Sequence, residues 1–90
     1  MIAGINLVGK FTFSRSFMEN LHKRIDPSSR LEVPSILEAV EFGTDGTNRV
    51  VELVYQNADK AGFVRGTYRC NAYISPEGNL SKIMWSAKVE

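Results

Sequence analysis

Apolar and small side chains alternate with polar ones over residues 63–75, and this alternation constrains the fold more than any other feature of the chain. A period of two is typical of a strand that has one face on a hydrophobic core. The even-numbered positions form the face that we expect to be buried: Val64, Gly66, Tyr68, Cys70, Ala72 and Ile74. Residues 75–78 read Ser-Pro-Glu-Gly, which is typical of a tight turn, so residues 80–89 should return as the neighbouring strand.

The dipeptide Asp45-Gly46 predicts a second hairpin, because it separates two strand-like segments at residues 36–42 and 49–56. This dipeptide tolerates the positive φ angles of a type I′ turn, and we expect these two residues to form the loop. In that register one face of the hairpin meets the core. It carries Ile36, Val40, Phe42, Val51, Leu53 and Tyr55, with Glu38 and Arg49 as polar exceptions.

An amphipathic helix is predicted between these hairpins and the start of the chain. Apolar residues recur on one helical stripe at Phe17, Met18, Leu21 and Ile25. Ser14 is one candidate for the N-cap, and Ser16 with Glu19 in a capping box is the other. The helix should end at Asp26, because a residue before proline avoids helical angles. His22 falls about 85° from the centre of the stripe, so we expect it to be solvated or part of an interface.

Residues 2–13 are rich in strand-forming side chains, with Gly4 and Gly9 among them, which predicts one strand with a bend or a bulge. The order of elements is therefore a strand, a helix and four more strands. We expect an α+β fold, β-α-β-β-β-β, in which one amphipathic helix packs on a curved antiparallel meander of four to five strands. The 90 residues suffice for one hydrophobic core, so residues 1–90 are expected to form a single domain.

Composition excludes several classes of function. Eleven Lys and Arg residues stand against ten Asp and Glu, and a net charge of +1 gives no overall field that would attract nucleic acid or anionic lipid. One cysteine, Cys70, and one histidine, His22, cannot form a disulfide framework or the usual zinc site. The chain shows no basic leader with a cleavage site and no membrane span, so we expect a cytoplasmic protein without metal, cofactor or membrane partner.

The most interesting candidate site is the non-core face of the last hairpin. In the predicted register Arg69 lies across from Trp85, and Asn71 lies across from Ile83. The candidate binding residues are Arg65, Arg69, Asn71, Tyr73, Ile83 and Trp85. The plainer interpretation is an ordinary Arg69–Trp85 cation–π pair, or a face covered by the N-terminal strand or by a second subunit.

No catalytic motif is present, which favours a non-enzymatic function. We expect a small protein-interaction module that binds a protein partner and self-associates as a homodimer, through an edge strand or through a sheet face. The alternative is a nucleic-acid-binding surface, since bases stack on aromatic rings while guanidinium groups contact phosphates. A less favoured alternative is a small-ligand pocket between helix and sheet, lined by Tyr55, Tyr68 and His22.

Overall fold

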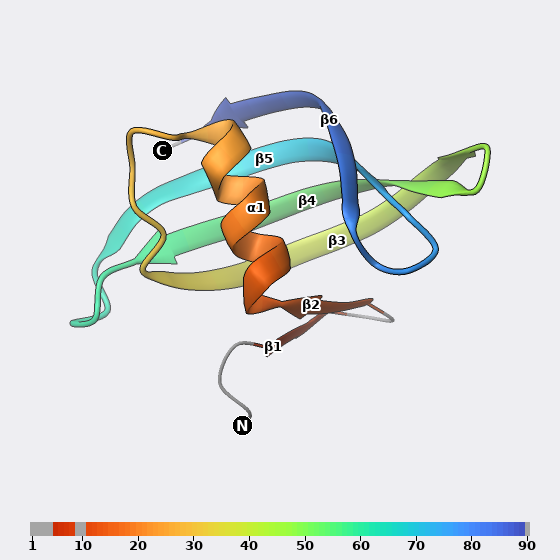
Figure 1. The fold of residues 1–90 in the computed structure, drawn as a ribbon. Helices are drawn as coiled ribbons and strands as arrows, with labels where there is room; N and C mark the ends of the chain where they lie inside the picture. The colour runs from red at the N-terminus through yellow and green to blue at the C-terminus, as the bar shows by residue number, and fades with distance from the viewer. Residues whose placement is uncertain (1–4, 9–10, 90) are drawn as a thin grey trace.

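The computed structural model describes residues 5–8 and 11–89, and it places one helix against an antiparallel sheet (Figure 1). The described elements, in chain order, are β1 (Ile5–Val8), β2 (Phe11–Ser14), α1 (Arg15–Ile25), β3 (Val33–Asp45), β4 (Asn48–Ala58), β5 (Val64–Ile74) and β6 (Leu80–Lys88). Strands β3 to β6 form a four-stranded sheet in sequential order, and β1 pairs with β2. The predicted α+β class and antiparallel meander are therefore confirmed.

Helix α1 begins at the first of the two predicted caps. The Ser14 hydroxyl accepts a hydrogen bond from the Phe17 backbone N–H at 3.1 Å, so Ser14 rather than Ser16 is the N-cap. The helix ends where the Asp26 N–H donates to the His22 carbonyl at 2.8 Å, one residue before Pro27. The buried residues of α1 are Phe17, Met18, Leu21 and His22. The apolar stripe thus faces the sheet as predicted, and His22 is buried with it instead of being solvated.

Glycines close the turns between the strands of the sheet. Asp45 pairs with Asn48, so the β3–β4 loop consists of Gly46 and Thr47, and the predicted Asp45-Gly46 loop is wrong by one position. Only Gly46 has a positive φ, 62°, which fits a type II′ turn rather than the predicted type I′ turn. The predicted turn at residues 75–78 is confirmed: the Gly78 N–H donates to the Ser75 carbonyl at 2.9 Å, and Gly78 has a φ of 86°.

The N-terminal segment forms a hairpin, not the single bent strand that was predicted. Strands β1 and β2 pair antiparallel, with Asn6 opposite Phe13. Residues 2–4 and 9–10, which include Gly4 and Gly9, lie outside the described residues. Strand β2 leads directly into α1, and β1 lies beside β3 (Figure 1).

Two β-bulges in β3 change which of its side chains face the core. Each bulge adds one residue to β3, first at Leu37 and then at Phe42. The two faces of the strand are therefore exchanged between the bulges. Val40 and Phe42, which were predicted to be core residues, are 53% and 57% exposed. Ala39 and Glu41 pair with the inward-facing Leu53 and Val51 instead.

The hydrophobic core lies between α1 and the face of the sheet that the helix covers. Its buried members come from β2, the helix and all four strands of the sheet: Phe11, Phe13, Phe17, Met18, Leu21, Ile36, Val51, Leu53, Tyr55, Tyr68, Cys70, Ala72, Ile74 and Leu80. The even-numbered positions of β5 from Gly66 to Ile74 are buried as predicted, and Thr67 on the other face is also buried, at 8% exposure. Val64 is an exception at 52% exposure, because a register shift at Ala58 leaves Arg65 as an extra residue. Within the described ranges, no helix has the length and apolarity needed to cross a membrane.

Candidate functional site

The face of the sheet that points away from α1 is called the outer face. Cross-strand pairing defines it, because directly paired residues point to the same side of a sheet. For example, cross-strand pairs join Glu38 on β3, Val54 on β4, Arg69 on β5 and Ala87 on β6 in one row across the sheet. The outer face consists of Glu38, Val40, Val50, Glu52, Val54, Arg69, Asn71, Tyr73, Lys82, Trp85 and Ala87.

Four of the predicted binding residues lie together on this face. Arg69, Asn71 and Tyr73 alternate along β5, and Trp85 on β6 lies directly opposite Asn71. The predicted pairing of Arg69 with Trp85 is wrong by two residues. Register shifts in the β5–β6 pair leave Ser81 and Met84 as extra residues in β6, which moves every later residue of that strand along its partner.

The other two predicted residues, Ile83 and Arg65, are not part of the outer face. Ile83 pairs with the buried Ala72 and packs against the hydrophobic core, because the extra residue Ser81 exchanges the faces of the strand before it, and Met84 exchanges them again before Trp85. Arg65 is the extra residue at the start of β5, and its guanidinium forms an ion pair with Asp59 at 3.0 Å. The structure therefore reduces the candidate set to Arg69, Asn71, Tyr73 and Trp85, and adds neighbouring residues that the sequence did not indicate.

The outer face combines one exposed ring, Trp85, and the half-buried ring of Tyr73 with charges that have few intramolecular contacts. Val50 and Val54 lie buried between these side chains, at 6% and 7% exposure. Trp85 is 48% exposed. The Lys82 ammonium lies 4.9 Å from the centroid of the Tyr73 ring, so the cation–π pair of this face is Lys82–Tyr73 and not Arg69–Trp85. Arg69 and Glu52 form neither an ion pair nor a hydrogen bond through their side chains with the rest of the described chain. These groups are available to contact another molecule.

No described element covers the outer face. Helix α1 lies on the opposite side of the sheet, and the β1–β2 hairpin lies at the edge beside β3 (Figure 1). The first strand was one of the expected covers, and residues 5–8 and 11–14 do not provide it. Aromatic and Arg side chains on an open surface are typical of protein interfaces.

A second cluster of functional groups lies buried between α1 and the sheet. The Tyr55 and Tyr68 rings stack with centroids 5.0 Å apart, and the His22 ring packs edge-on against both. His22 Nδ1 and the Tyr55 hydroxyl are hydrogen-bonded at 2.7 Å, and the Tyr68 hydroxyl donates to Asp26 Oδ2 at 2.9 Å. His22, Tyr55 and Tyr68, the residues named for a pocket between helix and sheet, are each at most 1% exposed.

Burial suppresses the acid–base reactivity of this cluster. It raises the pKa of both tyrosine hydroxyls, so Tyr55 and Tyr68 remain protonated at neutral pH. It also lowers the pKa of His22, against smaller opposing effects of the Ser29 backbone and the Asp26 charge. The pKa of the neighbouring Cys70 thiol rises to about 12, which keeps this cysteine unreactive as predicted from its core position. The arrangement joins the end of α1 to the sheet and offers no activated nucleophile.

The buried His22 makes the stability of the fold dependent on pH. Its pKa is lowered in the folded state, so its contribution to stability is complete above its unfolded value of about 6.5. That contribution is lost as the pH falls below 6.5 towards the folded-state pKa. Urea unfolding followed by circular dichroism should therefore give a lower midpoint at pH 5.5 than at pH 7.5.

His22 is the only histidine of the chain, which provides a clear control. In a His22→Leu variant the midpoints at pH 7.5 and 5.5 should nearly coincide, whatever the overall stability of that variant. Equal midpoints for the wild-type chain, or an equal decrease in the variant, would show that His22 is not the titrating group.

Comparisons with family models, curated proteins and solved structures find no match for this chain. In the described part of the chain, no three His, Cys, Asp or Glu side chains are grouped in a way that could hold a metal ion. Function is therefore inferred from the geometry of the surfaces alone, and the outer face is the strongest candidate.

Proposed function

We propose that this chain is a non-enzymatic protein-interaction module that self-associates through its outer face. The observation that carries the proposal is an open sheet surface on which Trp85 is half-exposed beside unpaired charges. Tryptophan and arginine are the residues that most often dominate binding energy at protein interfaces. Exposure of this surface to water does not stabilise the folded monomer, whereas binding to a partner would bury the surface.

Irregularities on both edge strands favour association through the face over association through an edge. Strand β3 carries two bulges and also Pro34, which has no N–H to donate. Strand β6 has two register shifts and carries lysines at positions 82 and 88. Bulges, prolines and lysines are the features by which natural sheets prevent edge-to-edge pairing.

The distribution of charge on the outer face favours a second copy of the same chain as the partner. Glu38 and Glu52 lie on β3 and β4, whereas Arg69 and Lys82 lie on β5 and β6. Two copies can pack face to face around a two-fold axis that runs parallel to the strands near the middle of the sheet. The β3–β4 half of each copy then lies over the β5–β6 half of the other copy. The acidic half of each copy then meets the basic half of its partner, which is the self-complementarity that an isologous dimer requires.

The shapes of the side chains agree with the same arrangement. An axis between β4 and β5 places Trp85 of one copy over Val40 of the other, and Tyr73 over Val50. Both contacts join a large ring to a smaller aliphatic side chain. Asn71 then faces the Glu52 carboxylate, to which its amide N–H can donate. Each contact occurs twice in the dimer because of the symmetry.

A nucleic-acid partner has weaker support from the same face. Arg69 and Lys82 are balanced by Glu38 and Glu52, so the outer face carries no excess of positive charge. A single-stranded oligonucleotide that quenched Trp85 fluorescence, with affinity falling steeply as salt is added, would instead favour this alternative.

The proposal predicts concentration-dependent association that requires Trp85. In sedimentation velocity the wild-type chain should pass from monomer to dimer as its concentration rises, and Trp85→Ser should raise the dissociation constant at least about tenfold. Phe63→Ser is the matched control, since Phe63 is 71% exposed but lies on the β4–β5 loop outside the outer face. A strictly monomeric wild-type chain, or equal weakening by both substitutions, would refute the proposal.

A further inference from the structure

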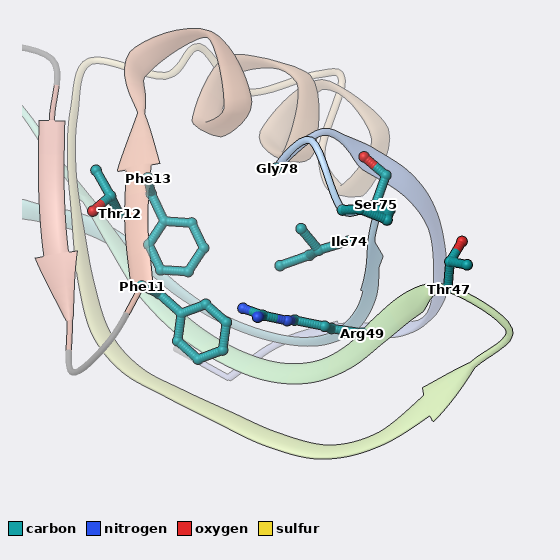
Figure 2. Close-up of a pocket in the computed structure, with 9 residues that line it drawn as sticks. Phe11, Thr12, Phe13, Thr47, Arg49, Ile74, Ser75 and Gly78 are labelled. Atoms are coloured by element: carbon teal, nitrogen blue, oxygen red, sulfur yellow. The ribbon is translucent and has the colours of Figure 1, made fainter.

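An open cavity of about 460 Å³ lies at the end of the sheet remote from the His22 cluster. Strand β2, the β3–β4 turn, the start of β4 and the β5–β6 turn surround it (Figure 2). Its lining residues are Phe11, Thr12, Phe13, Thr47, Arg49, Ile74, Ser75, Pro76 and Gly78. The volume lies within the range of natural small-molecule sites.

Among the described residues that line this cavity, Arg49 alone is charged, and its side chain lies on the core side of the sheet. It pairs with the buried Ile74, so its side chain points to the same side of the sheet as the core. Figure 2 shows its guanidinium directed towards Phe11 and Phe13. The Arg49 side chain is 51% exposed, so its guanidinium lies at the open side of the cavity, where a ligand can reach it.

The Arg49 guanidinium has few contacts with the described part of the chain. Glu41 lies on the core side of β3 between its two bulges, and its carboxylate lies 3.7 Å from Arg49 Nε. The guanidinium also lies 5.9 Å from the centroid of the Phe11 ring. Its two terminal nitrogens make no hydrogen bond with the described part of the chain. These nitrogens form the fork that binds carboxylates through two parallel hydrogen bonds.

The wall beside this fork is aromatic. The Phe11 and Phe13 rings stack with centroids 5.8 Å apart and an angle of 14° between their planes. Ile74 is buried on the opposite side. Thr12, Thr47 and Ser75 add hydroxyl groups to the lining. The cavity therefore combines one cationic fork with a flat apolar surface.

We propose that this cavity binds a small aromatic monocarboxylate. The carboxylate accepts hydrogen bonds from Arg49 Nη1 and Nη2, and the ring of the ligand packs against Phe11 and Phe13. The Glu41 carboxylate beside Arg49 favours a single negative charge on the ligand over a phosphate dianion, because it repels a second negative charge. This site is independent of the outer face, since it lies on the other side of the sheet.

The test is a titration of the ¹⁵N-labelled full chain with 2-naphthoate, followed by ¹H–¹⁵N correlation spectra. Saturable shifts are expected at Thr12, Thr47, Ile74, Ser75 and Gly78. The neutral isostere 2-naphthamide and inorganic phosphate are the comparison ligands, and both should bind at least tenfold more weakly. Arg49→Gln should weaken 2-naphthoate binding at least tenfold, whereas Arg30→Gln, on the exposed α1–β3 loop, should leave it unchanged.

Several results would overturn the proposal. Equal binding of 2-naphthamide would remove the role of the carboxylate, and this comparison needs only the wild-type chain, so it holds even where Arg49→Gln fails to fold. Shifts confined to other parts of the chain, tighter binding of phosphate, or no saturable shift at millimolar 2-naphthoate would each refute the site.

Discussion

Replacing Leu53 with alanine is expected to lower the free energy of unfolding by about 3 kcal/mol, because it leaves a cavity at the centre of the core. Leu53 is fully buried on β4, with Ala39 and Cys70 opposite it on the two neighbouring strands. Both neighbours are small, so they cannot fill the space that a leucine side chain vacates. Domains of this size are typically stable by only about 5–15 kcal/mol, so this loss is a large fraction of the total.

The matched control is the same leucine-to-alanine substitution at an exposed position of the edge strand β3. Leu37 is the extra residue of the first β3 bulge and is 47% exposed, so Leu37→Ala should cost less than about 1 kcal/mol. Urea unfolding of the two variants and the wild-type chain, at one low protein concentration, measures both values. Similar losses for the two variants would contradict the placement of the core.

The order and type of the main elements could be predicted because local patterns determine them. The helical stripe and the Ser14 cap predicted α1, and the alternation of small and apolar residues predicted the buried face of β5. The turn at residues 75–78 was predicted because its proline and glycine have few alternative conformations. In these segments the local signal and the final packing agree.

The bulges could not be predicted, and most errors follow from them. One extra residue in a strand reverses the faces of every residue beyond it, and only pairing with the neighbouring strand determines where the extra residue falls. Val40 and Phe42 were therefore predicted on the core face and are exposed. Ile83 was predicted beside Arg69 and Asn71, and the extra residue Ser81 turns it to the core.

The candidate sites show the same limit. His22 was placed at the margin of the helical stripe, and its burial depends on Tyr55, a hydrogen-bond partner from a distant strand that the helical periodicity does not reveal. Arg49 was recognised as a polar exception on the core face. Its contact with Glu41 could not be predicted, because the second bulge of β3 creates it.

Reversing one charge near the middle of the outer face is expected to abolish self-association. In the proposed dimer the acidic β3–β4 half of each copy lies over the basic β5–β6 half of the other. In this arrangement Arg69 lies over the partner's Val54, and the partner's Glu52 is two residues along the same strand. Arg69→Glu therefore places a carboxylate beside the partner's Glu52, and Glu52→Arg places a guanidinium beside the partner's Arg69. Each substitution should raise the dissociation constant at least about a hundredfold, since the unfavourable contact occurs twice in the symmetric dimer.

The folded monomer should tolerate both substitutions. Arg69 is exposed, and neither its side chain nor that of Glu52 forms an ion pair or a hydrogen bond with the described part of the chain. Circular dichroism spectra and urea midpoints at low protein concentration should therefore stay close to those of the wild-type chain. A loss of folding in either variant would contradict the assignment of these residues to an open surface.

Sedimentation of an equimolar mixture of the Arg69→Glu and Glu52→Arg variants tests the self-complementary outer face most directly. Each variant alone should sediment as a monomer at a concentration where the wild-type chain is dimeric. In the mixture each introduced charge lies close to a residue of opposite charge on the other variant, so a heterodimer should form. A mixture that remains monomeric while the wild-type chain dimerises, or an Arg69→Glu variant that dimerises as the wild-type chain does, would contradict the proposed interface.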